Sequence, residues 1–167
     1  WLLPEYAPVR ISQVCHELSF QSRQAKGRRV LVDGGREVIE TLHARGYRLG
    51  IVSNLIGEHE VPDWLEEDRL DPYFSSVVLS SVCHLRKPGA EIYRIALREL
   101  GVEPGECVSV ADNIKRDITG AKEAGIGCNV IFRSPEKKHP VVFTEENRPD
   151  AVISQFTELL DLLPALN

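Results

Sequence analysis

The sequence of 167 residues contains no methionine, no long apolar run and no block of basic residues. A membrane-spanning helix needs about 20 consecutive apolar residues, and the first residues lack the charged and apolar regions of a signal peptide. The net charge of −5 argues against a surface for nucleic acid or anionic lipid. We therefore expect neither a nucleic-acid partner nor a membrane partner.

Cysteine is scarce and scattered. No two cysteines form a C-x-x-C pair, and they stand at Cys15, Cys83, Cys107 and Cys128. Buried free thiols are therefore expected, rather than zinc ligands or a disulfide framework, which favours a cytoplasmic location. A hydrophobic content of 43% and a charged content of 27% are those of an ordinary globular domain, and the length suffices for one core.

Short apolar runs alternate with helical patterns along most of the chain. The runs are typical of strands in their length and occupy residues 48–53, 76–79, 107–111, 128–132 and 150–153. Helical spacing of apolar residues separates them, as in Ile92, Ile95, Ala96 and Leu100. This alternation predicts an α/β fold in layers.

Two carboxylates follow the apolar run of residues 107–111. Asp112 ends this run, and Asp117 stands five positions later at the expected start of a helix. Ligands bind at the carboxyl ends of parallel strands in open α/β sheets. Two acids this close repel unless a cation lies between them, and magnesium with oxygen ligands is the usual solution. Acids also suit a helix N-terminus for dipole reasons alone, so the pair does not decide the function by itself.

A hydroxyl, an amide and a cation lie upstream of the two acids. Ser53 and Asn54 end the run of residues 48–53, and Lys87 stands before Pro88 on a later connection. The residue before a proline is kept out of the helical region, so Lys87 is expected in an extended segment. Together with the two acids, these groups can hold a phosphoryl group.

The order Ser-Asn, then Arg-Lys-Pro, then Asp-x4-Asp-x2-Gly-Ala-x2-Ala-Gly resembles the haloacid dehalogenase superfamily of hydrolases over about residues 36–165. The resemblance implies a three-layer α/β/α sandwich with a Rossmann-like, mostly parallel sheet. It also implies a magnesium-dependent phosphatase that removes phosphate from a small metabolite through an aspartyl-phosphate. The acid at Asp112 sets the chain apart from the metal-free dehalogenases, which have an uncharged residue there.

The same resemblance assigns roles to the five candidate site residues. Ser53 would bind phosphate, with Asn54 beside it. Lys87 would neutralise charge on the phosphoryl group and on the nucleophile. Asp112 would bind Mg²⁺, and Asp117 would support the metal or orient Lys87. These roles are those that phosphoryl transfer requires.

The first motif of that superfamily, Asp-x-Asp with the nucleophile, is missing. Asp33 is the only aspartate before Ser53, but Gly35 stands where the second acid should be. A single helix with Val38, Ile39 and Leu42 facing inward would run from Asp33 to the Ser53 strand, which leaves no room for a loop and flap. We interpret residues 28–35 as the entry into that helix, so the chain alone is expected to be inactive.

Residues 1–27 are expected to be the remnant of a helical cap, and residues 28–167 the hydrolase core without its first strand. The absence of methionine and the initial Trp1 agree with a fragment of a longer parent. In the superfamily, the strand with the first motif lies between the strands that end at Ser53 and near Asp112. Without it, the fragment either folds poorly or fills this place, with Val30–Asp33 or with a second chain, so a homodimer is possible.

Two other classes compete with the phosphatase. A non-catalytic member of the superfamily would bind a partner or a phosphorylated ligand without turnover. A response-regulator-like module would need its acidic cluster on an early strand, which this sequence lacks.

Overall fold

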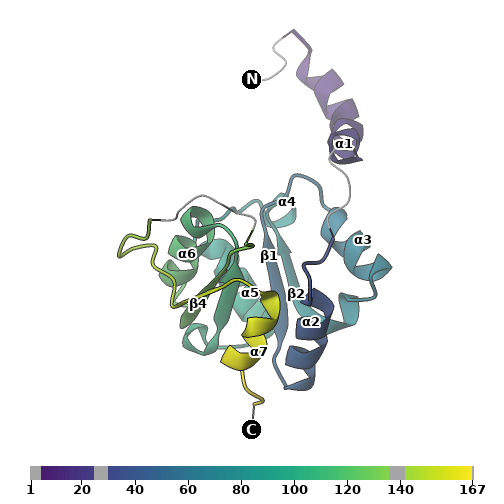
Figure 1. Ribbon diagram of the computed structural model, residues 1–167. Coiled ribbons are helices and arrows are strands. Elements are labelled where there is room, and N and C mark those ends of the chain that lie inside the picture. Colours follow the sequence, from purple (N-terminus) through teal and green to yellow (C-terminus); the bar gives the residue numbers. More distant parts are fainter. Residues whose placement is uncertain (1–4, 25–29, 136–141, 167) are drawn as a thin grey trace.

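The computed structural model describes residues 5–24, 30–135 and 142–166, which form an α/β fold with parallel strands (Figure 1). The strands are β1 (Leu49–Ser53), β2 (Phe74–Leu79), β3 (Val108–Ala111), β4 (Cys128–Phe132) and β5 (Ala151–Ile153). The α-helices are α1 (Pro8–Gln24), α2 (Gly35–Ala44), α3 (Glu60–Glu67), α4 (Ser80–Cys83), α5 (Glu91–Leu100), α6 (Ile114–Glu123) and α7 (Leu159–Leu162). Short 3₁₀ turns η1 (Asp71–Tyr73), η2 (Pro104–Glu106) and η3 (Phe156–Glu158) complete the described elements. The predicted α/β class is confirmed.

The sheet is divided in two. In the described part of the chain, β1 pairs only with β2, while β3, β4 and β5 form a separate sheet in that order. All the pairs are parallel. The division lies between β1 and β3. This is the place at which the superfamily is expected to have the strand with its first motif.

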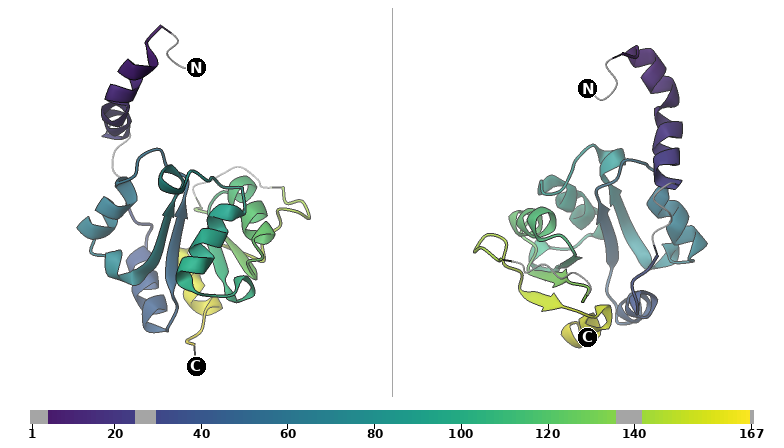
Figure 2. Two further views of the ribbon diagram at one scale, coloured as in Figure 1. Left: turned by 180° about the vertical axis from the view of Figure 1, so that it is seen from behind. Right: turned by 45° about the horizontal axis from the view of Figure 1, so that its top comes forward.

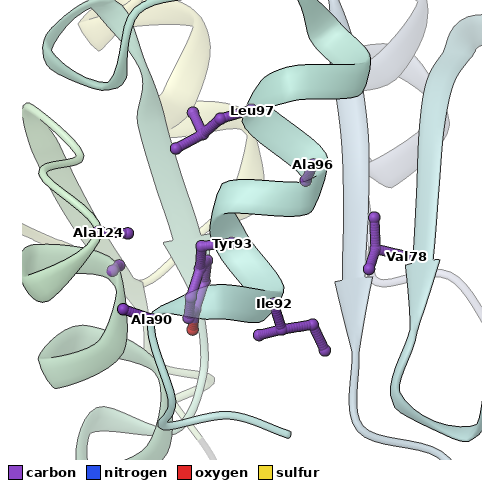
Figure 3. Packing of buried hydrophobic residues seen from close by; sticks show 8 residues of the cluster. Val78, Ala90, Ile92, Tyr93, Ala96, Leu97 and Ala124 are labelled. Atoms are coloured by element: carbon purple, nitrogen blue, oxygen red, sulfur yellow. The ribbon is translucent and has the colours of Figure 1, made fainter. Parts of the chain in front are cut away.

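Two apolar clusters hold the two sheets together, one on each face. On one face, α5 packs against β2 and β1 and also against α6, with Ile92 on the side of Val78 and Leu97 on the side of Ala124 (Figure 3). On the other face, Val38 and Leu42 of α2 join a cluster that includes residues of β4, β5 and α7. Figure 2 shows α5 from behind, on the face opposite to α7. Burial of these side chains connects the two sheets across the division, where no described strand pairs with both.

A groove of about 650 Å³ occupies the division. We call it the inter-sheet groove; residues of β1 and β3 and side chains of α2, α5 and α7 line it, and its lining also includes Gly46, Lys87 and Asp117. A closed, dry cavity of this size would cost about 15 kcal/mol at about 24 cal/mol per Å³, as much as the whole stability of a typical domain, about 5–15 kcal/mol. The groove must therefore be filled by water or by another segment, and Val110 of β3, 37% exposed, shows that it is accessible.

The segment Val30–Asp33 does not fill the inter-sheet groove. It forms no strand, and Val30 is 83% exposed. The carbonyl oxygen of Val32 accepts a hydrogen bond from the amide of Gly35 at 2.9 Å, which closes a turn into α2. The sequence suggested that either Val30–Asp33 or a second chain fills the gap between the sheets. The first of these two predictions is wrong for the described chain.

Helix α1 was predicted from the spacing of Ile11, Val14, Cys15 and Leu18, and the helix is present. It stands apart from the two sheets (Figure 1), and Val14 and Leu18 are 43% and 51% exposed. The side chains of Val14 and Leu18 are therefore left without a cover among the described residues. No helix in the described ranges is both long enough and apolar enough to cross a membrane.

Hydrogen bonding in β3 shows which amides face the groove. The amide of Cys128 donates to the carbonyl oxygen of Cys107, in register with the pairing of Val108 and Cys128. Alternate residues of a strand turn their backbone groups to the same neighbour. Ser109 therefore faces β4, whereas Val108 and Val110 direct their backbone groups into the groove.

This alternation predicts the pattern of amide hydrogen exchange. The amides of Val108 and Val110 should exchange at least tenfold faster than those of Ser109 and Ala111, because only the latter pair donate to β4. Exchange of the folded chain followed by two-dimensional NMR measures all four. Equal protection of all four amides would show that another segment occupies the groove in solution.

Candidate active site

The candidate residues gather at the carboxyl edge of the two sheets. Ser53 is the last residue of β1 and Asn54 follows it; Asp112 follows β3, and Asp117 lies in the first turn of α6. Lys87 comes from the connection between α4 and α5. Carboxyl ends of parallel strands meet at one edge, which is where open α/β sheets bind ligands.

Lys87 is fixed at both its side chain and its backbone. Its ammonium nitrogen Nζ donates to the carbonyl oxygen of Val52 at 2.9 Å and lies 2.7 Å from Oδ1 of Asp117. Its backbone amide donates to Oδ1 of Asn54 at 2.9 Å, and its carbonyl oxygen accepts from Nδ2 of Asn54 at 3.0 Å. Both polar atoms of the Asn54 side chain are thus used on the backbone of Lys87, so this side chain positions the lysine.

Asp117 is a buried carboxylate between two cations. Its side chain is 2% exposed, and its Oδ1 lies 3.6 Å from Nε of Arg116 as well as next to Lys87. Neither contact is a well-aligned hydrogen bond, because both Oδ1 of Asp117 and Nε of Arg116 are buried without one. The hydroxyl of Tyr93 donates to the backbone carbonyl of Asp117 at 3.0 Å. Burial, and then the charge of Asp117, raise the pKa of Tyr93, so it remains a neutral donor.

Ser80 fixes the loop that follows β1 by two hydrogen bonds. The hydroxyl of Ser80 accepts from the amide of Leu55 at 2.9 Å and donates to its carbonyl oxygen at 3.0 Å. Ser80 is itself 5% exposed. Sequence reasoning missed Ser80 and Tyr93, because nothing in their local pattern indicates contacts with segments about two dozen residues away. Sequence reasoning also assigned Asn54 to phosphate binding and did not predict its hydrogen bonds with Lys87.

Gly120 allows α6 to approach the connection that carries Lys87. A Cβ atom at Gly120 would lie 2.1 Å from the carbonyl oxygen of Pro88, a distance at which the backbone would have to move. Ala121 on the same helix and Ala124 directly after it are buried as well. The small face of α6 therefore sets how close Asp117 comes to Lys87.

The donor set agrees with a magnesium ion that has only part of its ligands here. Asp112 offers a carboxylate at the end of β3, and Oδ1 of Asp117 is a buried acceptor without an aligned donor. However, Lys87 and Arg116 already neutralise Asp117, and no group of three or more acidic, histidine or cysteine side chains comes together among the described residues. Mg²⁺ keeps several waters and needs one or two carboxylates, so Asp112 fits as one ligand and the rest must come from water, backbone or another segment.

The other polar candidates do not join this site by any described contact. His84 ends α4 with a positive φ of 59° and is exposed. Burial raises the pKa of the Cys107 and Cys128 thiols, which makes them poor nucleophiles. Asp33 lies exposed in the turn before α2, away from any strand.

The architecture and the polar edge define an α/β protein with a ligand site at the carboxyl ends of its strands. The family model described as haloacid dehalogenase-like hydrolase matches residues 11–131. This protein therefore belongs to the haloacid dehalogenase-like hydrolases. The match begins inside α1 and extends through almost all of β4.

Curated relatives are named as phosphatases. A glyceraldehyde 3-phosphate phosphatase from Methanopyrus kandleri is 33% identical over 135 residues, covering 78% of this chain and 56% of its own length. The pyrophosphatase PpaX from Halalkalibacterium halodurans is 30% identical and covers 78% of this chain and 59% of its own length. The chain thus spans a little over half the length of these relatives.

Solved structures show the same fold. The HAD phosphatase from Thermococcus onnurineus superposes with a TM-score of 0.68 at 29% identity, covering 80% of this chain and 58% of its own. A HAD-superfamily hydrolase of subfamily IA from Geobacter sulfurreducens gives a TM-score of 0.65 at 28% identity, covering 80% of this chain and 61% of its own. The predicted family and its Rossmann-like fold are confirmed.

The ion pair of Lys87 and Asp117 should contribute strongly to stability. Asp117→Asn leaves the ammonium group buried without a charge partner, so we expect the free energy of unfolding to fall by about 3–5 kcal/mol. Lys87→Met should cost a similar amount, and the double variant should lose clearly less than the sum. Urea unfolding of the four proteins measures this coupling.

A matched control is the exposed pair of Arg36 and Glu40, 3.3 Å apart on α2. Its coupling in the same cycle, with Arg36→Met and Glu40→Gln, should stay below about 0.5 kcal/mol. Equal coupling for the two pairs would contradict a structural role for the buried pair.

Proposed function

We propose that this chain carries the phosphate-binding and charge-neutralising part of a magnesium-dependent phosphatase that acts on a small phosphorylated metabolite in the cytoplasm. The observation that supports this most is the fourfold attachment of Lys87 at the carboxyl edge, to Val52 and Asn54 on either side of Ser53 and to Asp117. A lysine held so firmly offers a fixed positive charge, which is what a transferring phosphoryl group needs. The phosphatase names of the relatives point to the same substrate class.

Each residue then has a role that follows from its place. The hydroxyl of Ser53 binds a phosphate oxygen, and Lys87 neutralises charge on the phosphoryl group. Asn54 and Asp117 hold Lys87 in place. Asp112 holds Mg²⁺, which stabilises negative charge on the transferring group when bound. The aspartate that attacks phosphorus, and whose aspartyl-phosphate is then hydrolysed by water, comes from a segment other than those described.

Magnesium binding tests the role of Asp112. Calorimetric titration of the folded chain should show saturable binding of Mg²⁺, and Asp112→Asn should weaken it at least tenfold, because a carboxylate ligand is lost. Glu103→Gln changes an acid at the amino end of β3, far from the candidate site along the strand, and should leave binding unchanged. If the folded chain binds no Mg²⁺, Asp112 is not a metal ligand without a further segment.

Turnover tests the missing nucleophile. With Mg²⁺ and p-nitrophenyl phosphate or glyceraldehyde 3-phosphate, the chain alone should release no phosphate above the rate without protein. A longer parent with an aspartate before these residues should release phosphate, and Lys87→Met should abolish this release. Turnover by the chain alone that Asp33→Asn removes would instead make Asp33 the nucleophile.

A non-catalytic binding domain is the second candidate. It is favoured by the position of Asp33, the only aspartate before Ser53, in an exposed turn outside the sheet. Such a protein would bind a phosphorylated ligand through Ser53 and Lys87 without hydrolysing it, even as the longer parent.

A further inference from the structure

We propose that Ser80 is a positioning residue of the candidate active site. Its hydroxyl fixes Leu55, so that the neighbouring Asn54 stays bound to the backbone of Lys87 and keeps the lysine in place for a phosphate group. The inference rests on the proposed function, in which Lys87 neutralises charge on the phosphoryl group. In this role Ser80 acts through other residues and touches no substrate.

Side chains join two segments of the carboxyl edge that are far apart in the sequence. One is the loop of residues 54–57, which follows β1, and the other is the connection of residues 80–87, which includes α4 and ends at Lys87. Asn54 is the link near Lys87, because its side chain donates to the carbonyl oxygen of the lysine and accepts from its amide. The position of Lys87 therefore depends on where the loop holds Asn54.

Ser80 is the link at the other end of the connection. Its hydroxyl accepts from the amide of Leu55 at 2.9 Å and donates to the carbonyl oxygen of the same residue at 3.0 Å. No backbone group of the described residues donates to Leu55 or accepts from it, so the conformation of this residue depends on the hydroxyl. Because Leu55 directly follows Asn54, a change in its backbone would displace the Asn54 side chain from Lys87.

Burial makes the hydroxyl of Ser80 hard to replace. The residue is 5% exposed, so its loss would leave both backbone groups of Leu55 without a partner where water has little access. Unmade hydrogen bonds of buried groups are costly, and the loop would change its conformation to satisfy them. Ser81 donates to the carbonyl oxygen of Gly57 at 2.8 Å, which holds only the end of the loop away from Asn54.

Ser76 offers a matched control for Ser80. It lies on β2, is 4% exposed, and its hydroxyl donates to Oε2 of Glu99 at 2.7 Å. Both serines are buried and bind a distant segment through the hydroxyl, but Glu99 belongs to α5 and not to the loop that carries Asn54. Ser76→Ala should therefore destabilise the fold without changing the position of Lys87.

Hydrogen exchange of the Lys87 amide measures this position, because the amide donates to Asn54. Relative to the amide of Ile131, which lies on the central strand β4, Ser80→Ala should speed the exchange at least fivefold, and Ser76→Ala should leave it within about twofold. A general loss of stability would speed both amides alike. Asn54→Ala should also speed the exchange of Lys87, and Ser80→Ala should add nothing to it.

Two further substitutions at the same position separate the hydroxyl from the volume of the side chain. Ser80→Thr keeps the hydroxyl and should keep the exchange of Lys87 within about twofold of the original. Ser80→Cys replaces the hydroxyl with a thiol, which is a weaker donor, and should speed the exchange as Ser80→Ala does. The cysteine variant fills the same space, so it keeps the test decisive even where the alanine variant does not fold.

Binding of inorganic phosphate, followed by calorimetry on the folded chain, tests the link to function. Ser80→Ala should weaken this binding at least fivefold, because Lys87 is no longer held in place. Ser76→Ala should leave the affinity within about twofold of the original.

Two results would overturn the role of Ser80. One is an equal effect of Ser80→Ala and Ser76→Ala on the exchange of Lys87. The other is faster exchange of Lys87 in Ser80→Ala with unchanged affinity for phosphate. Absence of phosphate binding by the unaltered chain is a different result, since it would contradict the proposed function itself and thereby the part of Ser80 in it.

Discussion

The contact between Lys87 and Asp117 connects the two halves of this protein at its functional edge. Lys87 follows β2 in the chain and binds the carbonyl oxygen of β1, whereas Asp117 belongs to the helix that follows β3. No strand pairing in the described residues crosses between those halves. A buried ion pair repays its loss of hydration only when further hydrogen bonds support it; the carbonyl oxygen of Val52 accepts one from the ammonium group, and Asn54 fixes the backbone of Lys87.

The stability of the fold and the geometry of the candidate site therefore depend on the same few atoms. The apolar clusters hold the two sheets in contact through the helices on either face. The ion pair sets their relation at the carboxyl edge, where a ligand would bind. A shift of one sheet relative to the other would leave each cluster partly packed, but it would separate Lys87 from Asp117. The site can thus be lost while most of the fold persists.

The strands and the family were predictable, because both depend on local pattern. The apolar run of residues 128–132 coincides with β4, and that of residues 107–111 differs from β3 by one residue. The stripe Ile92, Ile95, Ala96 and Leu100 was too narrow, since Tyr93 and Leu97 are buried as well. Periodicity assumes one covered face, whereas α5 packs against strands and against α6.

The position of the candidate residues at the carboxyl edge was predictable from the sequence, whereas their contacts were not. Strand ends located Ser53 and Asp112, and the proline located Lys87. The two hydrogen bonds between Asn54 and the backbone of Lys87 join segments 33 residues apart. Their geometry follows from the tertiary fold alone.

Gly120 affects the attraction between the charges of Lys87 and Asp117, although it has no charge and no side chain itself. Because a Cβ atom there would meet the carbonyl oxygen of Pro88 at 2.1 Å, any larger residue pushes α6 away from the connection that carries Lys87. Asp117 lies one turn earlier on the same helix and would move with it. Widening the 2.7 Å separation of the charges to about 4 Å weakens their attraction by about 2 kcal/mol at an effective dielectric constant of about 20. The electric field at the carboxyl edge is thus set in part by the hydrogen atom that Gly120 carries in place of a side chain.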